Sequence, residues 1–251
     1  MKIVLLTALG VGGSTIAGAL IGFLLKKIPH KFNDIILGFA AGVMLAAAIL
    51  GLIIPATEYG TKLNILVVIA GIMAGAVFLS FIDKIVPHLH HLAGIDKEKH
   101  GGNTEHLNKI LLFVMAIAIH NLPEGIAAGV SFGTGNIGDA FTVAGGIALQ
   151  NIPEGMVIIA PMLAAGISKK RTFLIALSTG LVEVVGTMVG YFAISVSTVI
   201  LPFALAFAGG TMLYVISDEM IPETHSHGYE KGATYSLLIG FCVMLFMDIM
   251  I

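Results

Sequence analysis

Long apolar runs, separated by mostly short polar connections, fill this chain. Eight runs have the roughly 20 residues that a helix needs to cross a bilayer. They are Ile3–Leu25, Ile35–Ile54, Leu63–Phe81, Ile110–Ser131, Gly138–Leu163, Phe173–Ile194, Val199–Ile221 and Ala233–Ile251. The pattern predicts an all-α membrane protein, a bundle of eight transmembrane helices that forms a single domain over residues 1–251.

The composition agrees with a chain that lies mostly in lipid. Hydrophobic residues make up 57% and charged residues 11% of the 251 positions, and the mean hydropathy is +0.99. Soluble domains have about 45–50% apolar and about 25% charged residues. The net charge of -2 argues against nucleic acid as a partner, and the single Cys242 excludes a disulfide framework or a cysteine metal cluster.

The basic residues predict the orientation in the membrane. If the N-terminus is extracytoplasmic, eleven of the thirteen Lys and Arg residues fall in cytoplasmic connections, and only Lys2 and Lys62 lie outside. Cytoplasmic loops carry such an excess of positive charge. We therefore expect both termini to be extracytoplasmic. The long polar stretch at about 84–109 would then be a cytoplasmic loop, and it carries His88, His90, His91, His100 and His106.

Glycines recur four positions apart within several runs. The pairs are Gly18 and Gly22, Gly38 and Gly42, Gly71 and Gly75, and Gly186 and Gly190. Such pairs let helix backbones approach closely in lipid. We expect them to tighten the packing within the chain, with a dimer face as the alternative.

Two copies of one polar cluster lie in the middle of the fourth and fifth runs. Residues 120–125 read His-Asn-Leu-Pro-Glu-Gly, and residues 150–155 read Gln-Asn-Ile-Pro-Glu-Gly. At 3.6 residues per turn, His120 lies above Glu124 and Gln150 above Glu154, and each intervening Asn lies within about 100° of both partners. A carboxylate at the bilayer centre is costly, so it marks a functional site by default.

Prolines and a further acid strengthen this interpretation. Pro123 and Pro153 each leave a helical carbonyl without its donor, which in hydrocarbon needs another partner or a water-filled cavity. Broken helices that carry acids at mid-depth form cation sites in transporters. Glu183 lies at the middle of the sixth run, on a face of small and polar residues. No Lys or Arg lies in these three runs to pair with the acids, so we expect one shared cation site.

The predicted site combines one imidazole, three carboxylates and three amides. Its residues are His120, Asn121, Glu124, Gln150, Asn151, Glu154 and Glu183. Imidazole with carboxylate suits Zn, Fe, Mn or Co, whereas Mg²⁺ and Ca²⁺ prefer cages made only of oxygen. The expected ligand is therefore a divalent transition metal, and its binding should weaken in acid because the ligands must be deprotonated.

The chain resembles the prokaryotic branch of the ZIP (Zrt/Irt-like) family of divalent metal transporters. The features that carry the resemblance are the doubled motif on adjacent runs, the eight spans, the outward termini and the histidine-bearing loop. The resemblance covers essentially the whole chain. It implies a multi-pass protein of the plasma or inner membrane that imports zinc, and often iron, manganese, cadmium or cobalt, and that is neither an enzyme nor dependent on a catalytic cofactor. It implies a homodimer and an elevator-like movement, in which we expect the fourth to sixth helices to shift against the rest.

The resemblance also implies that the seven residues form a mid-membrane site for up to two ions, with Glu124 as the bridge. Two positions depart from many members of the family: Gln150 stands where His is frequent, and Asn151 where some members have Asp. Both departures remove a charge or a strong donor. We therefore expect one well-formed metal position and a weaker neighbour.

Further polar residues flank the membrane. Glu219, Glu223, His225 and His227 close the seventh run on the cytoplasmic side and resemble the family's exit-side metal relay, although ordinary polarity at a helix end explains them equally well. Asp248, near the outer face, is expected to be an interfacial residue, with a role at the entrance as the alternative.

Two other functions remain open from the residues alone. A proton-coupled divalent cation antiporter would use acidic repeats on broken helices equally well. A membrane-embedded metalloenzyme fits less well, because the His-Glu-x-x-His signature is absent and no nucleophile accompanies the cluster.

Overall fold

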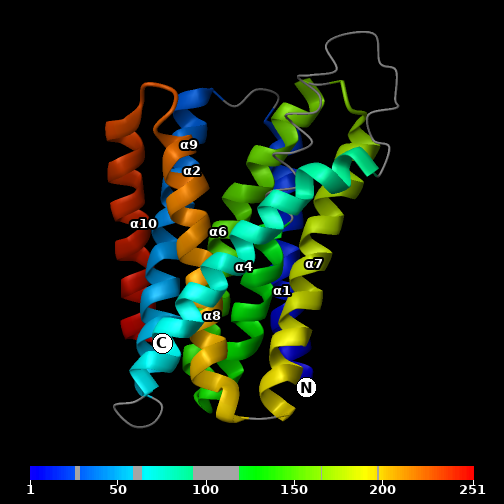
Figure 1. Cartoon of the computed structure of the whole chain (residues 1–251). Helices are drawn as coiled ribbons and strands as arrows, with labels where there is room; N and C mark the ends of the chain where they lie inside the picture. The colour runs from blue at the N-terminus through cyan, green and yellow to red at the C-terminus, as the bar shows by residue number, and fades with distance from the viewer. Residues whose placement is uncertain (26–28, 59–63, 93–118, 165, 197) are drawn as a thin grey trace.

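The structure, a computed structural model, describes residues 1–25, 29–58, 64–92, 119–164, 166–196 and 198–251. Every regular element in these residues is a helix (Figure 1). The α-helices that lie wholly within these residues are α1 (Lys2–Leu24), α2 (His30–Ala46), α3 (Ile54–Glu58), α4 (Asn64–Leu92), α6 (Ile137–Ala164), α7 (Lys169–Val196), α8 (Leu201–Val215), α9 (Ile221–Thr224) and α10 (Glu230–Met250). Residues 119–130 form a further helical segment. Short 3₁₀ turns occupy Ser131–Thr134 and Thr198–Ile200.

Seven of the predicted spans appear as helices long and apolar enough to cross a membrane within the described residues. The remaining predicted span, 110–131, lies partly outside those residues, and its described part is helical from 119 to 130. The prediction of a multi-pass, all-α membrane protein is therefore confirmed, while the count of eight stays a prediction. Both chain ends lie at the same end of the bundle (Figure 1).

The predicted start of the histidine-bearing loop was wrong. We expected it from about residue 84, but α4 continues to Leu92. Apolar side chains in the sequence 85–92 extend the helical pattern past the charged pair Asp83 and Lys84. The side chains of His88, His90 and His91, and the whole of residues 93–118, lie outside what the structure describes.

The glycine pairs join helices within the chain, as predicted. A Cβ atom at Gly42 would lie 1.9 Å from the carbonyl oxygen of Leu237 on α10, and one at Gly18 would lie 2.1 Å from that of Ile152 on α6. The same close approach to a backbone occurs for Gly75 of α4 against α8, and for Gly190 of α7 against the segment 119–130. Only glycine allows these pairs of helices to pack backbone against backbone.

These contacts divide the bundle into two groups. The motif group consists of α1, the segment 119–130, α6 and α7, and the outer group consists of α2–α3, α4, α8–α9 and α10. In Figure 1 the outer helices α2, α8, α9 and α10 lie to one side of α6, and α4 crosses the front at a slant. Between the groups, these glycines face side chains rather than a backbone: Gly51 lies against Val143, and Gly146 lies against Met244.

Prolines act differently from expectation. We predicted breaks at Pro123 and Pro153, but α6 runs through Pro153 as one helix, and the segment 119–130 is helical throughout. The helices are irregular at other prolines instead. Two π-helical stretches, Ala47–Ile53 and Ile216–Met220, end just before Pro55 and Pro222. A π-turn shifts the hydrogen-bond register, which accommodates a proline that has no N–H to donate.

Candidate metal centre

All seven predicted site residues are buried, and they come from three helices of the motif group. The most exposed, His120 and Glu154, have only 6% of their surface accessible. The structure therefore brings the polar residues of the doubled motif and Glu183 into the interior of the bundle. It arranges them as three contacting sets rather than as one ring of ligands.

The first set surrounds Glu183. Oε1 of Glu183 accepts a hydrogen bond from Thr15 Oγ1 at 2.7 Å and another from the amide of Asn121, and Oε2 accepts from Asn151 Nδ2 at 2.7 Å. Thr15 lies on α1 and is fully buried. Thr15 was not among the predicted site residues, although the sequence held a signal: it is a hydroxyl residue between Gly12 and Gly18, on a stripe of small residues.

The last glycine of each motif sets how closely the helices approach at this level. A Cβ atom at Gly125 would lie 2.3 Å from the carbonyl oxygen of Glu183, and one at Gly155 would lie 2.2 Å from that of Thr15. Each motif glycine follows its glutamate directly in sequence. The glycine therefore brings a neighbouring backbone against the helix where the polar side chains meet.

The second set pairs the two copies of the motif. Gln150 Nε2 donates to Glu124 Oε1 at 2.6 Å, between α6 and the segment 119–130. Glu154 and Glu183 are close enough to Glu124 for their negative charges to interact with it. Glu124 thus interacts with both of the other acids, and its role as a bridge between two ions stays a prediction.

Four buried oxygens of the motifs have no hydrogen-bond partner within the described residues. They are Asn121 Oδ1, Glu124 Oε2, Gln150 Oε1 and Asn151 Oδ1. Each such atom costs about 1–3 kcal/mol when it is left without a donor. Because the amide N–H groups already donate to carboxylates, the free atoms are all acceptors. A cation is the group that would satisfy several acceptors at once.

The third set joins the two helix groups. His120 Nε2 lies 2.7 Å from Oε1 of Glu219, which belongs to the π-helical turn after α8. Glu154 lies near enough to both residues for their charges to interact. The sequence placed Glu219 on an exit path, whereas the structure gives it direct contact with a predicted metal ligand.

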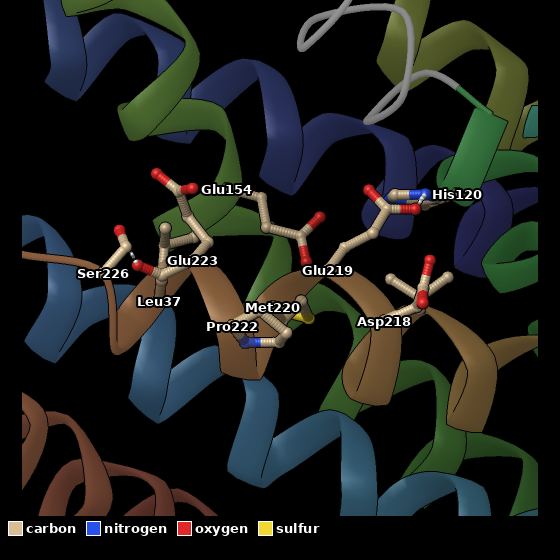
Figure 2. Close-up of a pocket in the computed structure, with 10 residues that line it drawn as sticks. Leu37, His120, Glu154, Asp218, Glu219, Met220, Pro222, Glu223 and Ser226 are labelled. Carbon is tan, nitrogen blue, oxygen red and sulfur yellow. Dashed lines mark hydrogen bonds and ion pairs between the residues drawn. The ribbon is translucent and has the colours of Figure 1, made fainter.

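A cavity of about 440 Å³ opens beside this third set. His120, Glu154, Asp218, Glu219 and Glu223 supply its ionisable lining, and Figure 2 shows Glu154 and Glu219 turned into the same space. Asp218 was not among the predicted site residues. Its position directly before Glu219 in the sequence was the signal that could have identified it.

The two predicted exit histidines face other partners. The His225 ring contacts the carbonyl of Ile221 and the hydroxyl of Thr234. His227 pairs with Asp34 instead. Neither histidine lines the cavity, whereas Glu219 and Glu223 both do.

Within the described residues, no three His, Cys, Asp or Glu side chains already converge as a metal ligand set. Glu183 accepts three hydrogen bonds from neighbouring side chains, and Glu124 accepts one from Gln150. The seven-residue metal site therefore stays a prediction. Asp248 remains at the last turn of α10, where its charge interacts with that of Asp139.

Comparisons with known proteins agree with this architecture. The ZIP zinc transporter family model matches residues 96–248. The zinc transporter GufA of Myxococcus xanthus is 41% identical over 250 residues, covering 97% of each chain. The zinc transporter ZIPB of Bordetella bronchiseptica is 37% identical, covering 94% of this chain and 77% of its own. Human zinc transporter ZIP11 is 31% identical, covering 94% of each. The chain therefore belongs to the ZIP family, whose members are transporters rather than enzymes.

Proposed function

We propose that this protein imports divalent transition-metal ions, zinc foremost, across the plasma or inner membrane into the cytoplasm. The observation that carries the proposal is the set of four buried, unpartnered oxygens within the doubled motif. Family membership supports it, as do the relatives named as zinc transporters. Iron, manganese, cadmium and cobalt are the alternative ions for the same donor set.

The stronger position for the ion lies beside the cavity. His120 and Glu154 supply a nitrogen and a carboxylate oxygen, the ligand types that zinc takes in proteins, and Glu219 supplies a third donor. A weaker second position uses oxygens alone, from Glu124, Asn121, Gln150 and Asn151. Glu183 is available to it only if the amides release the carboxylate.

The charge distribution supports import into the cytoplasm. Lys31, Lys169–Arg171 and Lys231 stand at or near the starts of α2, α7 and α10, at the end of the bundle away from both termini (Figure 1). By the positive-inside rule, we expect that end to be cytoplasmic and both termini to be extracytoplasmic. Glu223 of α9 and Ser226 just after it line the cavity, and α9 lies towards the same end (Figure 1), so we expect the cavity to open to the cytoplasmic side.

The moving part is the motif group, displaced against the outer group in an elevator-like step. We expected the fourth to sixth helices to move, and the packing adds α1, because Gly155 and Gly180 contact the backbone of α1 directly. Between the groups, glycines meet the side chains of Val143 and Met244, which can change rotamer as the surfaces slide. Metal leaves past Glu219 and Glu223. A homodimer held by the outer group is the assembly that we expect.

Radiolabelled zinc uptake into proteoliposomes tests this function. We expect saturable uptake that follows the zinc gradient without an imposed proton gradient. Uptake that requires an opposed proton gradient would instead identify the antiporter. No uptake by correctly inserted protein, in either condition, would contradict transport by this chain.

A further inference from the structure

A second group of metal-binding side chains lies away from the doubled motif, at the start of α2. Asp34 accepts a hydrogen bond from, or pairs with, His227 across a distance of 3.0 Å between Oδ1 and Nδ1. The His30 ring stacks on the His227 ring, with centroids 4.6 Å apart and planes inclined by 25°. Two histidines and one carboxylate thus lie together, from α2 and from the connection between α9 and α10.

Asp34 has the features of a ligand rather than of a surface acid. Its side chain is fully buried, and Oδ2 has no hydrogen-bond partner within the described part of the chain. One oxygen is held by His227, and the other is left in the interior without a donor. A buried charged oxygen in this state is costly unless a cation or a donor satisfies it.

The chemistry of the cluster selects the ion. Two imidazoles and a carboxylate form the three-ligand set that zinc accepts with water in the fourth position. In this conformation the rings are stacked, so their nitrogens do not yet converge with Oδ2. His30 lies exposed in the first turn of α2, four residues before Asp34 and on the same helix face. Binding of an ion by His30 together with Asp34 therefore requires a rotation about the His30 side-chain bonds.

We propose that His30, Asp34 and His227 form a peripheral binding site for a divalent transition-metal ion. The bound ion ties the start of α2 to the connection between α9 and α10. Leu37 follows Asp34 on α2 by three residues, Ser226 precedes His227, and both line the central cavity. The peripheral site therefore lies beside the cavity opening but shares no residue with the cavity lining. Its existence does not depend on the transport function.

Anomalous scattering at the zinc edge, from crystals of the full chain soaked in zinc chloride, locates the ion directly. We expect a peak about 2.0–2.2 Å from Asp34 Oδ2 and from one nitrogen of each histidine. An absent peak, in crystals whose central cavity holds zinc, would overturn the proposal. Because this measurement uses the unaltered protein, failed folding of a variant cannot affect it.

Equilibrium zinc binding by purified variants tests the ligand set. His30→Ala should bind one zinc equivalent fewer per chain, because His30 is exposed and is a proposed ligand of this site only. His225→Ala, two residues from His227 but bonded to Ile221 and Thr234, should retain the full stoichiometry. Unchanged zinc binding by His30→Ala would mean that Asp34 and His227 form only a structural pair, and the proposal would be wrong.

Discussion

His120 and Glu219 join the two helix groups across the candidate site, with Nε2 and Oε1 2.7 Å apart. The residues are separated by 99 positions in sequence. One belongs to the motif group and the other to the π-helical turn that ends α8. A displacement of the motif group must therefore break this contact, and a metal ion that binds His120 competes with it. In the proposed mechanism, the pair couples ion binding to the relative position of the groups.

Glu219→Gln should weaken zinc binding without preventing insertion. The substitution keeps the size of the side chain but removes a charge from the cavity wall. We expect an apparent affinity for zinc about 10-fold lower, equivalent to about 1.4 kcal/mol. Concentration-dependent uptake into proteoliposomes measures it. Glu230→Gln, an exposed acid at the start of α10, is the matched control and should leave uptake unchanged. An equal effect of both variants would contradict a specific role for Glu219.

Thr15→Val should destabilise the protein through Glu183. Valine has nearly the shape of threonine, but it removes the hydroxyl that donates to Oε1 at 2.7 Å. A buried carboxylate that loses a donor costs about 1–3 kcal/mol, so the melting temperature in detergent should fall. Thr15→Ser restores the donor and should recover most of the loss. A Thr15→Val protein as stable as the original would show that the hydroxyl is not needed.

Gly12→Ala and Gly13→Ala should differ sharply, although the residues are adjacent on α1. A Cβ atom at Gly12 would lie 2.3 Å from the carbonyl oxygen of Gly180, whereas one at Gly13 meets nothing within 4 Å. Gly12→Ala must push α1 away from α7 and should lower both thermal stability and uptake. Gly13→Ala should be neutral or stabilising by about 0.5–1 kcal/mol, because alanine favours the helix. Similar melting temperatures for the two variants would refute this packing.

Asn151→Asp should strengthen the second metal position. In the absence of metal, the change replaces a donor to Glu183 Oε2 with a second carboxylate, so stability should fall. In zinc, the same change adds a charged ligand. We expect the variant to regain stability on zinc addition and to bind more zinc per chain than the original protein, by equilibrium dialysis. Zinc binding equal to that of the original protein would contradict the assignment of Asn151 to the metal position.

Much of the fold could be predicted from periodicity and length. Apolar runs predict spans because only apolar side chains are stable in the hydrocarbon of the bilayer. Glycines four positions apart predict close helix contacts because they have no side chain to keep a neighbouring backbone away. The continuity of α6 through Pro153 could not be predicted in this way. Whether a proline breaks a helix depends on the neighbours that support the freed carbonyl, and those neighbours are set by tertiary packing.

The candidate site was predictable as a set of residues but not as a set of contacts. The i, i+4 spacing places Glu124 and Glu154 on polar faces, yet it does not show that Gln150 holds Glu124. Thr15 and Asp218 contribute from other helices, 168 positions from Glu183 in the case of Thr15. Sequence spacing within one helix carries no information about such distant partners.

Zinc uptake by Glu124→Gln proteoliposomes tests the central claim most directly. Glutamine keeps the shape of the side chain but removes the charge that interacts with Glu154 and Glu183. Size-exclusion chromatography and the melting temperature confirm that the variant is folded. We predict the loss of saturable zinc uptake from a folded, inserted protein. Uptake at the rate and affinity of the original protein would contradict the claim that the doubled motif binds the transported ion.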